Sequence, residues 1–321
     1  MVECSKDTLY SRVTLLSRAT PIRIRAKMEK DSALEFERWR EKKKIRVNEL
    51  LDRFIEAHCP SVILEKALRH ALFAGGKRIR PLIIYATSEA LGVEASQVDP
   101  VSAAIEMMHS YSLVHDDLPS MDDDDFRRGK PAVHKEFGEA TAVLTGDALL
   151  TYSFEVLADG GTGLAISDWT KILAKAGGAE GMIYGQLLDI ESSESLLSLK
   201  ELELMHRKKT GALFSASVEL VTALRPGESF PELHLFADHV GLCFQIRDDL
   251  LDVQGKPEIM GKPAGSDKKN NRSTFVSILG EEEAERRLEY ELELSLGCLQ
   301  KIEGDTTNLE NLARLIASRS H

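Results

Sequence analysis

Apolar residues recur at three- and four-residue intervals from Leu34 onward, and no convincing run of alternating apolar and polar residues interrupts them. Such intervals place apolar side chains on one face of a helix, whereas a strand alternates every second residue. The pattern therefore predicts an all-α chain. The expected helices cover about 36–58, 61–73, 80–91, 97–118, 136–157, 168–191, 198–224, 230–254, 281–303 and 306–318.

The expected helices follow one another without a linker rich in Pro, Gly or Ser, and the sequence has no internal repeat. Short connections make neighbouring helices mostly antiparallel, so we expect a single large bundle. One long polar loop, residues 256–272, interrupts the series. Loops of that length inside a compact domain usually serve a function, which makes this loop a candidate part of a site.

The N-terminal residues differ in composition from the bundle. Residues 1–30 carry several Arg, Ser and Thr residues, as organelle transit peptides do, but Met28 offers another start. We expect residues 1–34 to be a disordered N-terminal extension, in preference to an organellar targeting segment. Residues 35–321 are expected to form the domain.

One face of the helix expected at 230–254 changes from apolar to acidic along its length. Its members, four residues apart, are Phe236, Val240, Phe244, Asp248 and Asp252. Because the apolar part of this face packs into the bundle, the two carboxylates are expected to point inward. Buried carboxylates are too costly to keep ionised alone, so they are either protonated or share a cation.

The helix expected at 97–118 repeats this arrangement, because its apolar stripe ends at Asp116. The sequence from that residue onward reads DDLPSMDDDDFRRGK. We expect the proline-containing turn to fold Asp122 back beside Asp116, and we interpret residues 123–125 as a solvated tail. Two inward aspartate clusters with oxygen-only ligands fit Mg²⁺ better than zinc or copper.

Lysine and arginine residues lie in separate short motifs. GGKRIRP places Lys77 and Arg80 at a helix start, where the backbone dipole also favours an anion. Arg127 and Arg128 follow the first aspartate cluster directly. Further basic motifs are KKTG at 208–211 and GKPAGSDKKNNR at 261–272. Beside the aspartates, these motifs predict two anionic groups, one bridged by Mg²⁺ and one held by Lys and Arg alone.

Four polar residues stand on otherwise apolar helices: Gln186, Asp189, Thr210 and Gln245. A Mg²⁺-bound diphosphate is a good leaving group, and the dry interior of a bundle is a place where a carbocation could survive. The oxygens of these side chains could face developing positive charge. Ordinary hydrogen bonds between helices are an equally good interpretation of any one of them.

Net charge, the length of apolar stretches and the cysteine spacing limit the classes of partner and the cell compartment. The net charge of −11 argues against nucleic acid and against an anionic membrane surface, since both need a basic footprint. No apolar stretch reaches the length of about 18 residues that spans a membrane, so we expect no stable membrane insertion. The 4 Cys residues are widely separated and read as free thiols in a reducing compartment, which predicts a cytoplasmic protein.

Five motifs occur in one order along the chain: GGKRIRP, HDDLPSMDDDDFRRGKP, GQLLD, KTG and FQIRDDLLD. In this combination the chain resembles the trans-isoprenyl diphosphate synthases, and within them the bacterial-type farnesyl diphosphate synthases. The resemblance covers nearly the whole chain from about residue 35. It implies the isoprenoid synthase fold, with long helices around a central cavity, a homodimer, and three Mg²⁺ ions. The implied substrates are isopentenyl diphosphate and an allylic diphosphate.

The resemblance also implies roles for individual residues. The metal ligands would be Asp116, Asp122 and Asp248, with Asp117 and Asp252 supporting them. The allylic diphosphate would be held by Arg127, Lys209 and Lys262, with Arg272 in the same loop where the family usually has lysine. The isopentenyl diphosphate would be held by Gly76, Lys77, Arg80, His109 and Arg128. Thr210 and Gln245 would steady the allylic cation, and Gln186 and Asp189 are further candidates for that task.

The implied reaction is ionisation, condensation and elimination, giving (2E,6E)-farnesyl diphosphate from dimethylallyl and geranyl diphosphates. In this family the residues four and five before the first aspartate help to set the pocket floor, here Ser112 and Tyr111. A Tyr at the fifth position resembles enzymes that stop at fifteen carbons, and a smaller residue goes with twenty. Helical counting places Ser112 below Asp116 and Tyr111 off that line, so the ring must reach sideways to close the cavity.

Several alternatives stay open at this point. A geranylgeranyl or geranyl diphosphate synthase would carry the same motifs. A terpene cyclase would share the aspartate clusters but needs no second diphosphate site, which GGKRIRP and Arg128 supply. A non-catalytic subunit of a heteromeric synthase typically has eroded aspartate motifs, and both are intact here. A metal-buffering protein would not place Asp248 and Asp252 on an inward face.

Overall fold

The computed structural model describes residues 7–160, 164–192, 196–254 and 273–319. The chain divides into two units, Met1–Lys43 and Lys44–His321. Helix α1 (Asp7–His58) belongs to both, and it begins at Asp7 rather than near residue 36. The division of the chain into an extension at 1–34 and a domain at 35–321 stays a prediction. The expected polar loop at 256–272 lies outside the described residues.

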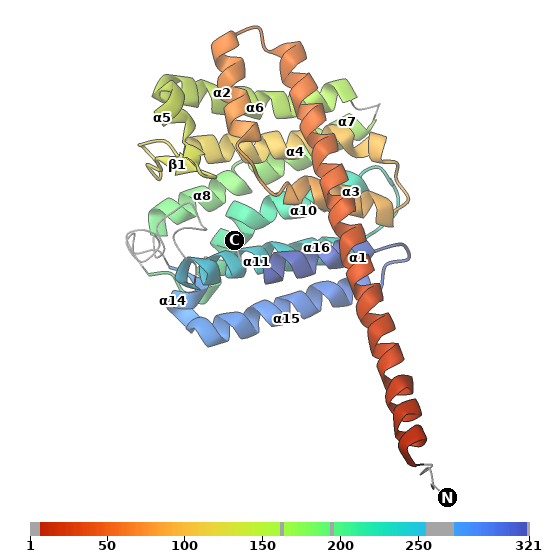
Figure 1. Cartoon of the computed structure of the whole chain (residues 1–321). Helices are drawn as coiled ribbons and strands as arrows, with labels where there is room; N and C mark the ends of the chain where they lie inside the picture. The colour runs from red at the N-terminus through yellow and green to blue at the C-terminus, as the bar shows by residue number, and fades with distance from the viewer. Residues whose placement is uncertain (1–6, 161–163, 193–195, 255–272, 320–321) are drawn as a thin grey trace, which may run out of the picture. The chain divides into compact units, whose positions relative to one another are not determined.

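In the second unit, the elements after α1 are helices except for one short hairpin (Figure 1). The helices before the hairpin are α2 (Val62–Phe73), α3 (Ile79–Ala90) and α4 (Ala95–Asp116). The hairpin strands are β1 (Phe126–Arg127) and β2 (Lys130–Pro131), followed by α5 (Val133–Phe137), α6 (Glu139–Gly160), α7 (Leu164–Gly177) and α8 (Met182–Glu191). The later elements are α9 (Leu199–His206), the π-helical segment η2 (Arg207–Gly211), α10 (Ala212–Thr222), α11 (Pro231–Gln254), α14 (Phe275–Leu279), α15 (Glu281–Leu299) and α16 (Thr307–Ser318). The predicted all-α class is confirmed.

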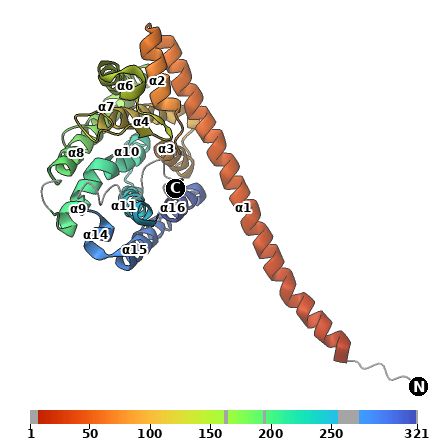
Figure 2. The ribbon, with the colours of Figure 1, turned by 60° about the vertical axis from the view of Figure 1, so that its left-hand side comes forward.

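Helices α4, α10 and α11 form the centre of this unit (Figures 1 and 2). Nearly every side chain of α4 between Val98 and Tyr111 is buried, because α3, α6 and α10 cover it. Helix α10 packs against both α4 and α11, and α11 packs against α15 and α16 on its other side. A helix that is apolar nearly all round requires such enclosure. The polar residues at the ends of α4 and α11 are therefore held by buried helices.

Two of the predicted helices are divided in the structure. The helix expected at 136–157 consists of α5 and α6, which meet at Gly138, where a φ of 87° ends the first helix. The helix expected at 168–191 consists of α7 and α8, separated by residues 178–181. The prediction of single helices over these segments was wrong, because periodicity continues across a break that only a few residues produce.

Two short elements were not predicted. The β1–β2 hairpin pairs Phe126 with Pro131 and Arg127 with Lys130. Its strands are too short to show an alternating pattern. Helix α14 begins after Thr274, whose side chain accepts from the Ser277 amide at 3.0 Å. Among the described helices, none combines the length and the apolarity that crossing a membrane would need.

Candidate active site

A cavity of about 460 Å³ opens beside the C-terminal half of α4. Its walls come from α3, α4, α6, α8 and η2 and from the loop after α4. The residues proposed from the sequence that line it are Arg80, His109, Tyr111, Ser112, Asp116, Gln186, Lys209 and Thr210. The rest of the lining is largely apolar and includes Leu150, Ile183, Leu187 and Ile190. The structure thus brings eight sequence-predicted residues to one apolar cavity.

Asp116 lies at the end of α4, and the predicted turn places Asp122 beside it. The Asp122 amide donates to the Asp116 carbonyl at 2.8 Å, and the Met121 amide donates to the Leu118 carbonyl at 2.9 Å. Burial raises the pKa of Asp116 to about 6; the charge of Lys209 opposes this shift and that of Asp122 adds to it. The loop thus concentrates negative charge at the cavity mouth, where a cation would relieve it.

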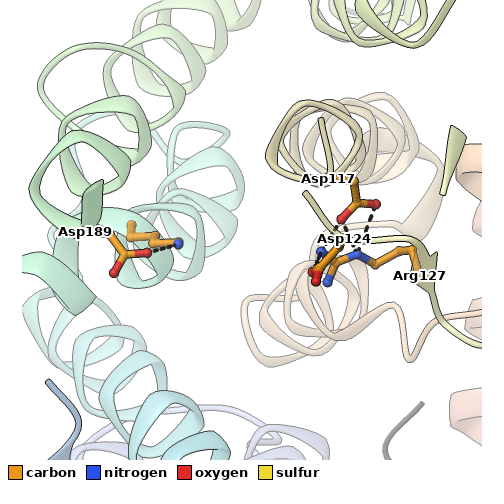
Figure 3. Close-up of polar contacts among 5 residues, drawn as sticks. Asp117, Asp124, Arg127 and Asp189 are labelled. Carbon is orange, nitrogen blue, oxygen red and sulfur yellow. Dashed lines mark hydrogen bonds and ion pairs between the residues drawn. The ribbon is translucent and has the colours of Figure 1, made fainter. Parts of the chain in front are cut away.

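Asp117, which the resemblance implies supports the metal ligands, binds Arg127 in the structure. Its carboxylate is buried and accepts from Arg127 Nε at 2.9 Å on Oδ1 and 3.2 Å on Oδ2. Arg127 Nη2 also donates to Asp124 Oδ2 at 3.1 Å, as Figure 3 shows. In this structure Asp117 and Asp124 therefore bind the guanidinium of Arg127. Asp124 is a contact of this cation rather than part of a solvated tail, which corrects that interpretation.

Arg80 and His109 line the cavity near other cations. The Arg80 guanidinium lies 5.1 Å from the Phe214 ring centroid, and its Nε is buried with no hydrogen-bond partner among the described residues. Burial lowers the pKa of Arg80 to about 10, with Glu106 opposing this shift and Arg128 adding to it. Burial and then the charge of Arg80 hold the pKa of His109 well below its usual range. His109 is therefore a neutral imidazole beside buried cations.

The GGKRIRP loop lies against the hairpin. Arg128 Nη1 donates to the Gly75 carbonyl at 2.8 Å, and its guanidinium lies beside Gly76. Lys77 is close enough to Asp248 to lower the pKa of that carboxyl, against the larger raising effect of burial. The loop and the hairpin thus bring Lys77, Arg80 and Arg128 toward one region.

The K-K-T-G motif forms the π-helical segment η2. Lys209 Nζ donates to Asp189 Oδ2 at 2.6 Å, in an ion pair whose Asp189 end is labelled in Figure 3. Thr210 Oγ1 donates to Gln245 Oε1 at 2.8 Å. A π-helical turn shifts the register of the helix by one residue, and such turns are frequent at functional sites. Here consecutive side chains of η2 reach α8 and α11, which ties both helices to the cavity wall.

Gly185 on α8 permits this arrangement. A Cβ at Gly185 would lie 2.0 Å from the Lys209 backbone nitrogen, so α8 and η2 approach each other backbone to backbone. Gly185→Ala is expected to lower the free energy of unfolding by about 3 kcal/mol, the upper part of the range for overpacking, and to displace Lys209. Urea unfolding measures the first effect, and steady-state turnover the second.

Gly297→Ala is the matched control, because nothing lies within 4 Å of a Cβ at that helical position on α15. It is expected to leave stability unchanged or to raise it by about 0.5 kcal/mol. Equal stability losses for the two variants would contradict the close approach of α8 and η2.

On α11 the predicted apolar stripe has Phe236 and Val240 buried and Asp252 largely buried, whereas the Asp248 side chain is 43% exposed. Asp248 has a partner that the sequence reasoning missed. Arg319 Nη2 donates to Asp248 Oδ1 at 2.6 Å and to the Phe244 carbonyl at 2.9 Å. No sequence pattern singles out Arg319, because it follows α16 and reaches α11 only through the fold.

Asp249 is a second residue that sequence reasoning missed. Its Oδ2 accepts from the Phe275 amide at 2.7 Å, which anchors the start of α14 to α11. Asp249 lies off the apolar stripe, because it follows Asp248 by one residue and faces another side of the helix, so the stripe did not single it out. Two predicted diphosphate ligands, Lys262 and Arg272, lie outside the described residues.

Tyr111 and Ser112 both line the cavity, on α4. The Tyr111 side chain is 6% exposed, and its hydroxyl lies 3.5 Å from the Gly177 carbonyl at the end of α7. The ring therefore extends away from the α4 axis toward another helix, as helical counting required. Ser112 Oγ donates to the His109 carbonyl at 2.9 Å and so remains close to α4.

Together the fold and the site define an all-α enzyme with an apolar cavity, whose mouth carries carboxylates and buried cations. The chain belongs to the polyprenyl synthetase family, whose model matches residues 61–308. It is 43% identical to a farnesyl diphosphate synthase of Geobacillus stearothermophilus, over 90% of this chain and 99% of that protein. It is 42% identical to a chloroplastic geranylgeranyl pyrophosphate synthase of Capsicum annuum, over 82% of this chain and 72% of that protein.

A solved structure, a geranyltransferase from Legionella pneumophila, has the same fold. It superposes with a TM-score of 0.81 at 32% identity and covers 90% of this chain and 98% of that one. The family model spans residues 61–308, so the cavity-lining residues and all five motifs lie within the matched region.

Proposed function

We propose that this protein is a Mg²⁺-dependent prenyltransferase that condenses isopentenyl diphosphate with dimethylallyl and geranyl diphosphates to give farnesyl diphosphate. The observation that carries the proposal is the pairing of an apolar cavity with two kinds of charge at its mouth. Asp116 lies there with a raised pKa, and Arg80 lies there with a buried, partnerless Nε among the described residues. A substrate with a diphosphate head and an apolar tail matches both parts.

The carboxylates at the site fit Mg²⁺, because they offer oxygen ligands and because burial raises the pKa of Asp116. Asp116, Asp122 and Asp248 would hold the metal, and three ions are proposed from the resemblance. Bound Mg²⁺ would neutralise the charge of the departing diphosphate. For Asp248 to serve as a ligand, Arg319 must share or release its carboxylate.

The chain's own residues supply orientation and dryness. Lys209 is fixed by its ion pair with Asp189 and lies close enough to Asp116 to lower the pKa of that carboxyl. This position would allow Lys209 to hold the allylic diphosphate. Thr210 lines the cavity and donates to Gln245, so both side chains are fixed close to the region that the allylic tail would occupy. Such fixed dipoles stabilise positive charge without reorganising. The apolar lining excludes the water that would quench a cation.

A second diphosphate would bind to Arg80, Arg128 and Lys77. These cations lie beside Asp248 or one another, as their mutual pKa effects show. This second cationic region supports a condensing enzyme over a terpene cyclase, which ionises one substrate. The intact aspartate motifs support a catalytic protein over a regulatory subunit. A homodimer and a cytoplasmic location are also proposed. Sedimentation and localisation of a tagged chain test them.

One incubation series tests the main proposal. The protein is given Mg²⁺, isopentenyl diphosphate and, separately, C5, C10 or C15 allylic diphosphate, and the product length is measured. C15 product from the C5 and C10 primers is expected. No condensation with any primer, in a preparation whose far-ultraviolet circular dichroism shows folded helices, would refute the proposal.

A C20 synthase is the second candidate, because one of the similar proteins is a geranylgeranyl pyrophosphate synthase at 42% identity. The Tyr111 ring at the cavity wall favours C15 over C20. Tyr111→Ala is expected to shift the main product to twenty carbons or more, because it opens the wall between α4 and α7. Product chromatography after incubation with the C10 primer measures the shift.

Tyr290→Ala is the matched control for this substitution. Tyr290 lies on α15 and is 56% exposed, so its removal should leave the product at C15. An unchanged product from Tyr111→Ala, at normal turnover, would show that Tyr111 does not limit chain length.

A further inference from the structure

His134 is a buried histidine that follows the β1–β2 hairpin. It is the second residue of α5, it is 6% exposed, and neither ring nitrogen has a hydrogen-bond partner within the described part of the chain. Buried polar atoms nearly always have a partner, so one imidazole with two unsatisfied nitrogens calls for an explanation. A ligand that binds a ring nitrogen would supply it.

The loop after α4 brings two carboxylates close to His134, and together these groups could bind a metal ion. One ring nitrogen of His134 and one carboxylate oxygen each of Asp123 and Asp125 all lie within 4.8 Å of one another. Both aspartates are exposed. Lys135 Nζ already contacts Asp125 Oδ1 at 2.6 Å, and this is the competing cation. The three side chains converge from two sides of the β1–β2 hairpin, since the aspartates precede β1 and His134 follows β2.

We propose that Asp123, Asp125 and His134 form a binding site for a divalent transition-metal cation, with Zn²⁺ as the ion that fits best. An imidazole nitrogen with two carboxylates is a ligand set for zinc and its neighbours, whereas magnesium takes oxygen ligands almost alone. The site uses none of Asp116, Asp122 and Asp248, and it does not depend on the proposed function.

The geometry allows closure around an ion. Bonds from zinc to nitrogen or oxygen are about 2 Å long and tetrahedral, so its ligand atoms lie about 3.3 Å apart. The ligand atoms here are within 4.8 Å of one another, so the exposed carboxylates need to move by up to about 1.5 Å. The buried imidazole can stay in place, because it is the ligand that packing already fixes.

A cation at this site would tie together the two ends of the hairpin. The Ala132 amide already donates to the Asp125 carbonyl at 2.9 Å, which is one bond across the base of the hairpin. The hairpin carries Arg127, which contacts Asp117, and Arg128, which contacts the Gly75 carbonyl. The metal ion would thus position the side chains of Arg127 and Arg128 and take no part in the chemistry itself.

The test measures zinc binding to the full chain without substrate. Zinc is titrated against a chromophoric chelator in the presence of millimolar Mg²⁺, both in the wild type and in an Asp116→Asn/Asp248→Asn background that removes predicted magnesium ligands. One zinc per chain with similar affinity is expected in both. His134→Gln is expected to weaken zinc binding at least 100-fold, which is about 2.7 kcal/mol.

Two further variants test whether zinc binds at Asp123, Asp125 and His134 and not at another site. Asp123→Asn/Asp125→Asn changes exposed side chains only, so it should keep the fold and still weaken zinc binding at least 10-fold. His58→Gln removes a histidine that lies 3.3 Å from Asp159 Oδ2, and it should leave zinc binding unchanged. Co²⁺ substitution should give visible absorption bands in the wild type that His134→Gln lacks.

Two results would overturn the proposal. One is zinc affinity in folded His134→Gln and in the double aspartate variant equal to that of the wild type. The other is no zinc bound by the wild type at millimolar concentration. Neither result bears on prenyl transfer, which is measured with Mg²⁺ and substrates, so the two proposals fail separately.

Discussion

Replacement of Asp116 by Asn is expected to lower kcat about 10³-fold, which corresponds to about 4 kcal/mol of transition-state stabilisation. Asparagine preserves the shape of the side chain but removes the charge that Asp116 brings to the cavity mouth, where Lys209 and Asp122 are its electrostatic neighbours. If the carboxylate holds magnesium against the departing diphosphate, its loss affects the ionisation step more than substrate binding. Turnover at saturating substrates measures the loss, and a Mg²⁺ titration should show a raised half-saturation concentration.

Asp238→Asn is the matched control, because Asp238 lies on α11 but contacts Ser215 Oγ at 2.7 Å rather than the cavity. Its kcat should stay within about twofold of the wild type, since exposed polar substitutions away from such sites have small effects. A kcat for Asp116→Asn within threefold of wild type, with folded protein, would contradict the role of Asp116 as a metal ligand.

Periodicity predicted those parts of the site that depend on neighbours along one helix. The stripe from Phe236 to Asp252 and the position of Asp116 at the end of α4 follow from spacing alone, because side chains four residues apart share a helix face. The turn that returns Asp122 to Asp116 is local as well, since one backbone hydrogen bond closes it. Local rules sufficed where the contacts are local.

Partners that are far apart in the sequence escaped prediction. Arg319 meets Asp248 across 71 positions, and Arg78 meets Glu106 across 28. No helical count connects such residues, because the fold alone brings them together. The π-helical turn at η2 was missed for a different reason: a one-residue change of register leaves the apolar pattern of the segment intact. The resemblance named Arg80 and Lys77, yet it did not indicate that Arg78 between them is structural.

Arg78→Met is expected to lower the free energy of unfolding by about 4 kcal/mol, within the range for breaking a buried ion pair on one side. Arg78 Nη1 donates to Glu106 Oε1 at 2.7 Å, and both side chains are 2% exposed. Its Nε also donates to Asn48 Oδ1 at 2.9 Å, and its Nη2 contacts the Leu72 carbonyl at the end of α2. Methionine would leave the Glu106 charge buried among apolar helices, and urea unfolding would measure the loss.

A double-mutant cycle separates the ion pair from the other contacts of Arg78. Arg78→Met/Glu106→Leu removes the buried charge as well as its partner, so it should be more stable than Arg78→Met alone, although the bonds to Asn48 and Leu72 remain lost. Arg286→Met removes the exposed ion pair with Glu283 on α15 and should change stability little, because solvent screens it.

If the double variant were as unstable as Arg78→Met, the cost would lie in the lost hydrogen bonds and not in the stranded carboxylate. Arg78 joins α2 to α4 directly beside Lys77. Arg78→Met is therefore expected to keep the fold but to bind isopentenyl diphosphate more weakly.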